Sequence, residues 1–170
     1  MLKKTLLTFS LLLTFVFAAQ AQELSPTAAW AATLRYRVVP NVTYLTANGY
    51  EAKLDVYQPS TATGNTPVVV FIHGGGWSIG DKAMGTRNKA SHFNSEGYAF
   101  ASLNYRLAPE TDPGGQAADI AAALAALRAK ADMLGFDPDK ILLMGHSAGA
   151  HLAALVSTDS RYLESAGVPM

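Results

Sequence analysis

The sequence predicts an α/β fold in which a mostly parallel sheet carries helices on both faces. Three continuous apolar segments predict strands that are buried on both sides, as in sheets covered by helices. These segments are residues 68–72, 98–105 and 141–144. Helical patterns separate them, and this alternation of strand and helix is typical of parallel sheets. The chain has 170 residues, 49% apolar and 15% charged, which suits one globular domain rather than disorder.

Two alternating segments before the buried strands predict an antiparallel hairpin. Val42–Thr46 and Ala52–Tyr57 are rich in strand-forming residues, and Asn48-Gly49 between them is a strong turn signal. Residues 22–35 predict a short helix with Ser25 as its N-cap.

Two further helices are predicted between the buried strands. The first covers residues 87–97 and ends at Gly97. The second begins at Asp112-Pro113 and ends at Gly135, because apolar residues between these points form one stripe at helical spacing. The stripe consists of Ile120, Leu124, Leu127, Ala131 and Leu134.

Residues 1–21 have the features of a signal peptide. Lys3 and Lys4 precede an apolar run, and Ala19-Gln20-Ala21 fits the small-x-small pattern of a cleavage site. A membrane anchor is the alternative, but the run is shorter than the roughly 20 residues that span a bilayer. We therefore expect export to the periplasm or the medium, no stable membrane anchor after cleavage, and a catalytic domain that starts at residue 22.

The composition gives no indication of a cofactor, a metal or a nucleic-acid partner. The chain has no cysteine, hence no disulfide and no lipid-carrying cysteine, and its formal net charge is +0. No cluster of His, Asp and Glu has the spacing of metal ligands. Oligomeric state is left open.

Gly145-His146-Ser147-Ala148-Gly149 lies directly between the third buried strand and a segment of helical, small-residue character. In that context a Gly-x-Ser-x-Gly string predicts a sharp strand-to-helix turn that holds a serine out as a nucleophile. The alternative is a tight turn with an incidental serine. Gly145 and Gly149 are expected to be glycines because a side chain there would collide with the adjoining helix and strand.

A second glycine motif, His73-Gly74-Gly75-Gly76-Trp77, follows the first buried strand. Three consecutive glycines are costly to order, so a gain must offset that cost. We expect the gain to be backbone N–H groups aimed at one point, an oxyanion hole, with His73 hydrogen-bonded to the loop. The alternative is a flexible loop.

Both motifs resemble the α/β-hydrolase superfamily over residues 40–160. The HGGG loop and Tyr105-Arg106-Leu107-Ala108-Pro109-Glu110 resemble the hormone-sensitive-lipase-like esterases, and the string from His73 to Lys82 resembles the feruloyl-esterase and kynurenine-formamidase-like branch. The resemblance implies hydrolysis of a small-molecule carboxylic ester through an acyl-enzyme on Ser147. It also implies an oxyanion hole and a set of supporting residues. The oxyanion donors would be Gly75, Gly76 and Ala148, supported by His73, Gly74, Trp77, Gly145, His146 and Gly149. Asp81 and Lys82 either order this loop or form a solvated charge pair.

The triad implied by the resemblance is incomplete in this sequence. After Ser147 the chain offers only His151, Asp159 and Glu164. His151 follows the serine by one helical turn and is expected to be structural. We therefore expect residues 22–170 to be the N-terminal part of a longer catalytic domain, inactive alone, with the last strand left at an exposed edge. The alternatives are an amide or peptide hydrolase on the same scaffold, or an exported binding protein without catalysis.

Overall fold

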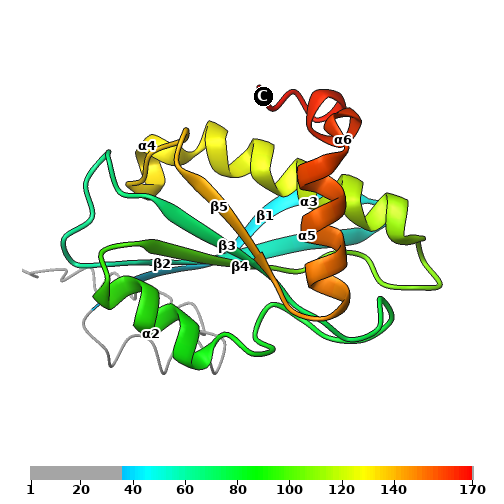
Figure 1. The fold of residues 1–170 in the computed structure, drawn as a ribbon, viewed down its shortest axis with the longest axis horizontal. Helices are drawn as coiled ribbons and strands as arrows, with labels where there is room; N and C mark the ends of the chain where they lie inside the picture. The colour runs from blue at the N-terminus through cyan, green and yellow to red at the C-terminus, as the bar shows by residue number, and fades with distance from the viewer. Residues whose placement is uncertain (1–35, 170) are drawn as a thin grey trace, which may run out of the picture.

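The computed structural model describes residues 36–169, and their strands form a single five-stranded sheet in the order β1-β2-β4-β3-β5 (Figure 1). The strands are β1 (Arg37–Ala47), β2 (Tyr50–Gln58), β3 (Val68–Ile72), β4 (Ala99–Leu103) and β5 (Ile141–Gly145). The helices are α2 (Arg87–Ser95), α3 (Pro113–Ala129), α4 (Ala131–Leu134), α5 (Ala148–Thr158) and α6 (Ser160–Ser165). The predicted α/β architecture is confirmed.

The hairpin of β1 and β2 is the antiparallel part of the sheet. Ala47 pairs with Tyr50 across the turn, where Asn48 and Gly49 have φ of 50° and 82°, as a two-residue hairpin turn requires. Strand β1 begins five residues before the predicted Val42. Strand β2 then pairs antiparallel with β4.

Strands β3, β4 and β5 form the parallel part. Ile72 at the end of β3 pairs with Leu103 of β4 on one side and with Gly145 of β5 on the other. The carboxyl ends of these three strands therefore lie at one edge of the sheet, the edge where ligands bind in α/β proteins. Strand β4 is shorter than the predicted 98–105.

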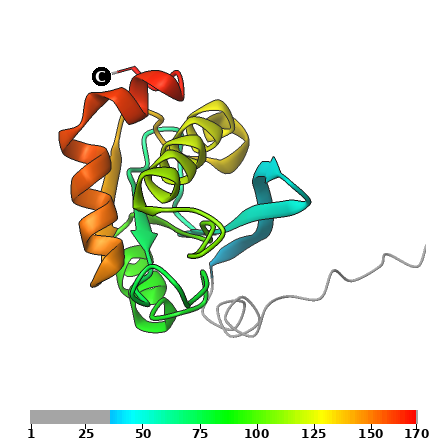
Figure 2. The ribbon, with the colours of Figure 1, turned by 90° about the vertical axis from the view of Figure 1, so that its right-hand side faces the viewer.

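Helices cover both faces of the sheet (Figure 2). Each face has its own apolar core. Helix α2 packs on one face, where Ala90 belongs to an apolar cluster with Tyr57, Val69, Phe71 and Phe100. Helices α3 and α5 cover the other face, over a larger core that contains Val70, Ile72, Ile120, Leu127 and Leu152.

The predicted helix from Asp112 to Leu134 is in fact two helices. Asp112 caps the start as expected, since its carboxylate accepts a hydrogen bond from the Gly115 amide at 2.8 Å. The break comes at Lys130, whose amide contacts the carbonyls of both Ala126 and Leu127, so the last turn of α3 is tightened. The apolar stripe is buried in both parts, and Gly135 ends α4 at φ 71°. Helix α2 ends two residues before Gly97.

The predicted signal peptide and the helix at 22–35 lie outside the described residues. Among residues 36–169, no helix has the length and apolar character needed to cross a membrane.

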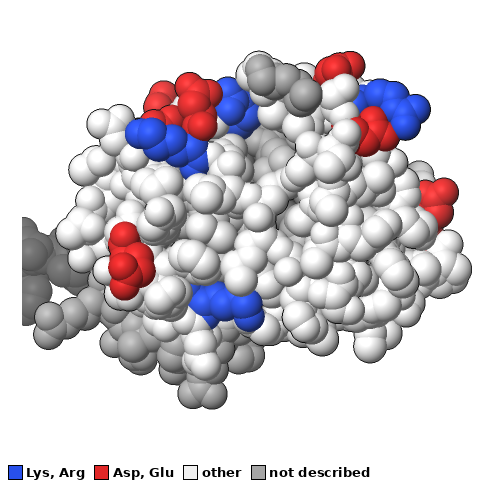
Figure 3. Space-filling view, in the orientation of Figure 1, with Lys and Arg blue, Asp and Glu red and all other residues white. Residues whose placement is uncertain are grey.

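Strand β5 is the last strand of the described sheet, and its Leu142 is 47% exposed. Charged side chains lie mainly along the margins of the face in Figure 3 and are sparse at its centre.

Candidate active site

The turn between β5 and α5 holds Ser147 in a backbone conformation that L-residues rarely adopt. Its φ is 54° and its ψ is −120°, and its side chain is exposed at the first position before α5. Such strain, of order 1–3 kcal/mol, persists only where the surroundings enforce it, and it concentrates at functional sites. The helix that follows begins at Ala148, and its positive dipole end lies next to Ser147.

The two flanking glycines enforce this turn by close packing of backbone against backbone. A Cβ on Gly145 would overlap the carbonyl of Gly149, and a Cβ on Gly149 would overlap the carbonyls of Ile72 and His73. The prediction that a side chain at either position would collide with the adjoining elements is confirmed.

The register of β3 and β5 brings the two glycine motifs together. Because Ile72 pairs with Gly145, the residues that follow each strand also lie side by side, and the His146 amide donates to the Ile72 carbonyl at 3.2 Å. A Cβ on Gly74 would lie 3.1 Å from the Cβ of Ser147 and 3.0 Å from Nδ1 of His146. His146 therefore lies beside the HGGG loop, with its side chain exposed.

Hydrogen bonds orient the peptide planes of the HGGG loop. His73 Nδ1 contacts the Gly74 carbonyl at 2.6 Å, and the amides of Ser78 and Ile79 donate to the Gly75 carbonyl at 3.2 and 3.1 Å. In a trans peptide the N–H points away from its own carbonyl. The N–H groups of Gly75 and Gly76 are thus turned away from these contacts. Within residues 36–169, no group accepts a hydrogen bond from the amides of Gly75, Gly76 or Ala148.

The imidazole of His73 is buried and serves the loop rather than proton transfer. It stacks on Tyr105 at 4.4 Å between ring centroids, and the Tyr105 hydroxyl donates to the His73 carbonyl at 2.9 Å. Burial lowers the pKa of His73, which favours the neutral ring, and the Gly74 carbonyl then requires the proton on Nδ1. Burial also raises the pKa of Tyr105 to about 12, so its hydroxyl stays a donor.

A second contact holds the loop at Trp77, which has φ 62° and leaves its side chain 36% exposed. Its carbonyl accepts from the Ala108 amide at 2.9 Å and from Nε2 of Gln116 at 2.8 Å. Gln116 is fully buried on α3. Gln116 could not be identified from the sequence, because nothing in its local pattern distinguishes it from any polar residue near a helix start.

The segment that supplies Ala108 is itself fixed by a buried carboxylate. Asp119 on α3 accepts from Nη2 of Arg106 at 2.6 Å, from its Nε at 2.9 Å and from its backbone amide at 3.0 Å. This bidentate pair is the strong form of an ion pair, and Asp119 is 1% exposed. Residues 105–110 thus support the HGGG loop through the hydrogen bond from the Ala108 amide to the Trp77 carbonyl.

The open question about Asp81 and Lys82 is resolved by the structure. Lys82 is buried and pairs with Asp55 of β2 at 2.6 Å, whereas Asp81 accepts a hydrogen bond from the Ala83 amide. Lys82 therefore anchors the loop to the sheet and does not form a solvated pair with Asp81.

No described histidine makes a hydrogen bond or ion pair with a carboxylate within residues 36–169. His151 is exposed on α5 and contacts Trp77 edge-on at 5.6 Å between ring centroids. His92 lies on α2 beside Phe93. The described residues thus bring together a serine and free amides, but not a base with its orienting acid. They also contain no group of three or more His, Cys, Asp or Glu that could hold a metal.

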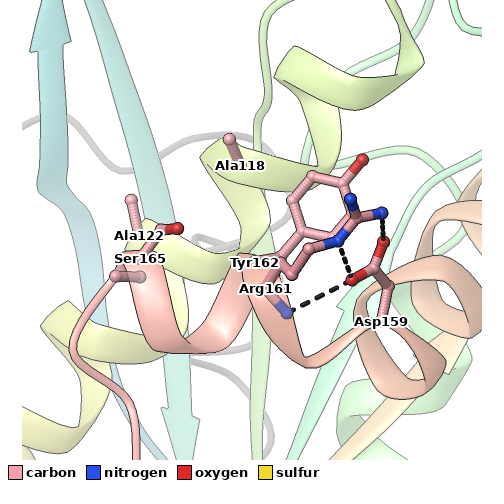
Figure 4. Close-up of a pocket in the computed structure, with 7 residues that line it drawn as sticks. Ala118, Ala122, Asp159, Arg161, Tyr162 and Ser165 are labelled. Carbon is pink, nitrogen blue, oxygen red and sulfur yellow. Dashed lines mark hydrogen bonds and ion pairs between the residues drawn. The ribbon is translucent and has the colours of Figure 1, made fainter.

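A cavity of about 510 Å³ lies between α3 and α6, apart from Ser147 and the HGGG loop (Figure 4). Ala118, Ala122, Tyr162 and Ser165 line it together with the ion pair of Arg161 and Asp159 at 2.6 Å. None of the predicted site residues lines this cavity.

Comparison with known proteins finds esterases that resemble this chain over about two thirds of its length. A probable isoprenylcysteine alpha-carbonyl methylesterase of Arabidopsis thaliana (ICMEL1) is 35% identical over 113 residues, which are 66% of this chain and 24% of that protein. Carboxylesterase NlhH of Mycobacterium tuberculosis is 36% identical over 119 residues, covering 66% of this chain and 37% of that enzyme. The chain thus spans about a quarter of the plant relative and somewhat more of the bacterial one.

Solved structures agree with this placement. The butyrate-bound esterase Est2 of Thermogutta terrifontis superposes with a TM-score of 0.63 at 30% identity, over 71% of this chain and 44% of that one. The same esterase has also been solved phosphorylated by paraoxon. The family model of BD-FAE matches residues 54–166, well over half of the chain and including both glycine motifs. The chain belongs to the BD-FAE family of α/β-hydrolases.

Proposed function

We propose that the protein is a carboxylic ester hydrolase in which Ser147 is the nucleophile. One observation carries the proposal: a strained, exposed serine lies against Gly74 of the HGGG loop, and the amides of Gly75, Gly76 and Ala148 have no acceptor within the described residues. The relatives named above are esterases, which supports this reaction over amide or peptide hydrolysis.

In the proposed reaction Ser147 Oγ attacks the ester carbonyl, and the alcohol leaves with a proton. The amides of Gly75, Gly76 and Ala148 donate to the oxygen that becomes negative in the tetrahedral intermediate. One such donor is typically worth about 2.7–4 kcal/mol in the transition state. Water then releases the acid from the acyl-enzyme, and no cofactor takes part in these steps.

The proton of Ser147 needs a general base, usually a histidine oriented by a carboxylate. No described histidine has a carboxylate partner. His73 is hydrogen-bonded to Gly74, and His151 lies against Trp77. We therefore propose that residues 1–170 alone turn over esters slowly or not at all. Residual catalysis from oxyanion donors and binding without a triad is about 10³–10⁴-fold over water.

We propose small esters as substrates and export as the destination of the chain. Est2 has been solved with butyrate and with propionate, so p-nitrophenyl butyrate is a suitable first probe.

The proposal of export rests on the pattern of Lys3, Lys4 and Ala19-Gln20-Ala21. Cell fractionation with N-terminal sequencing tests it, and a mature chain that begins at Gln22 is the expected result.

The test of the proposed function is ester turnover by the full gene product and by its Ser147→Ala variant. We expect turnover to fall by at least about 10³-fold, since the covalent route is lost. Ser157→Ala is the matched control, because Ser157 lies on the same helix and donates only to the Ala153 carbonyl at 2.8 Å. Turnover by Ser147→Ala at the wild-type rate contradicts the proposal. Amide analogues of the same acyl group separate esterase from amidase activity.

A further inference from the structure

Lys82 lies nine residues after His73, yet the structure ties it to the sheet at both its side chain and its backbone. Its Nζ donates to Asp55 Oδ2 at 2.6 Å, and its amide donates to Asn104 Oδ1 at 2.6 Å. Its carbonyl accepts from Ser102 Oγ at 2.5 Å. Three side chains from two neighbouring strands and the segment after β4 thus fix a single residue of the loop.

The ion pair is buried on both sides. The side chain of Asp55 is 0% exposed and that of Lys82 is 9% exposed. The second oxygen of Asp55 accepts from the Asn41 amide at 2.8 Å, so the carboxylate is also held from β1. Replacing a buried ion pair by apolar residues is often neutral for stability. Stability alone therefore does not account for this pair.

From Lys82 the chain leads back to the HGGG loop. Gly80, two residues earlier, packs on His73, since a Cβ there would lie 2.6 Å from His73 Nδ1. Ser78 and Ile79 donate to the Gly75 carbonyl and so set the plane of the peptide that carries the Gly76 N–H. Residues 78–82 are thus the link between the sheet and the proposed oxyanion donors.

We propose that the Asp55–Lys82 ion pair is a positioning device for the amides of Gly75 and Gly76. It anchors residues 78–82, which hold the Gly75 carbonyl and pack on His73. Asp55 and Lys82 touch no substrate; they act through the loop. The inference rests on the proposed function for its catalytic consequence, but its structural part, the ordering of residues 74–80, stands independently.

The test compares wild type with Lys82→Met and with the double variant Asp55→Asn/Lys82→Met in the full gene product. Hydrogen exchange, measured by mass spectrometry on peptides that cover residues 74–80, is expected to accelerate about tenfold while strand β3 stays protected. For p-nitrophenyl butyrate, kcat is expected to fall about 10- to 100-fold with KM within twofold, because small misplacements of catalytic groups are costly. The double variant regains stability relative to Lys82→Met, since no unpaired charge remains buried, but not kcat.

Leu134→Ala is the control for general destabilisation, because Leu134 is buried in the core on α4, far along the chain from the loop. It should lower the melting temperature without accelerating exchange in residues 74–80 and without changing kcat. If both ion-pair variants fail to fold, Ser102→Ala removes only the hydroxyl on the Lys82 carbonyl and should accelerate loop exchange about fivefold. Unchanged loop exchange in a folded ion-pair variant overturns the inference. Absent turnover in the wild type overturns the proposed function instead.

Discussion

The turn after β5 and the loop after β3 meet at the same point, but different forces hold them. In the turn, Gly145 and Gly149 let backbone pack directly on backbone, and the geometry of Ser147 follows from a few neighbouring residues. In the loop, polar side chains from distant elements, such as Gln116 and Asp55, fix a longer and glycine-rich segment. A steric constraint is local in sequence, whereas a polar anchor depends on what the fold brings near.

The largest effect is expected from adding one methyl group to the turn. In Gly149→Ala the new Cβ overlaps the Ile72 and His73 carbonyls, and neither backbone segment can move without disturbing the sheet. We expect a loss of about 3 kcal/mol or more in the free energy of unfolding, measured by denaturant titration.

Gly64→Ala is the matched control for this turn. Gly64 lies in the loop before β3 with nothing within 4 Å of a Cβ, so its free energy of unfolding should change by less than about 0.5 kcal/mol. Wild-type stability of Gly149→Ala would contradict the steric explanation.

A smaller and more selective effect is expected from Gln116→Leu, which keeps the volume but removes the donor to the Trp77 carbonyl. Turnover of p-nitrophenyl butyrate should fall about tenfold, while the free energy of unfolding falls by about 1 kcal/mol. Arg128→Met is the control, since Arg128 lies on the same helix and pairs with the exposed Asp139 at 2.8 Å. Equal turnover in Gln116→Leu and Arg128→Met would show that Gln116 does not hold the HGGG loop in its active geometry.

The smallest effect is a change in the pH dependence of stability. Burial lowers the pKa of His73 from 6.5, so below pH 6.5 the unfolded chain takes up a proton that the folded chain refuses. The neutral His73 makes its full contribution to the free energy of unfolding above pH 6.5. This contribution is lost as the pH falls toward the lowered pKa of the folded state. The free energy of unfolding between pH 7.5 and 5 should therefore drop more in wild type than in His73→Gln.

Glutamine is the comparison residue at position 73 because its side chain takes up no proton between pH 7.5 and 5. An identical drop in His73→Gln and wild type would show that His73 is not the group that titrates.

The sequence predicted the parallel strands, the hairpin turn and the place of Ser147 because each depends on local chemistry. Apolar runs mark buried strands, Asn48-Gly49 marks a two-residue turn, and a Gly-x-Ser-x-Gly string after a strand marks a sharp turn. The adjacency of the two glycine motifs, by contrast, is established by the pairing of β3 with β5 in the structure.

The anchors of the HGGG loop could not be predicted in the same way. Asp55 lies 27 residues before Lys82, and Gln116 lies 39 residues after Trp77, so only the packed sheet and α3 bring these pairs together. The break at Lys130 was missed for a similar reason, since the apolar stripe continues across it and stays buried on both sides.

Covalent labelling of the full gene product by paraoxon, with mass mapping of the modified peptide, tests the role of Ser147 most directly. Paraoxon transfers a diethylphosphoryl group to an activated serine, with p-nitrophenol as the leaving group. We expect one label per chain, on the peptide that contains Ser147, and none in Ser147→Ala. A label on another serine, or ester turnover that continues in folded protein without any label, would contradict the assignment of Ser147 as the nucleophile.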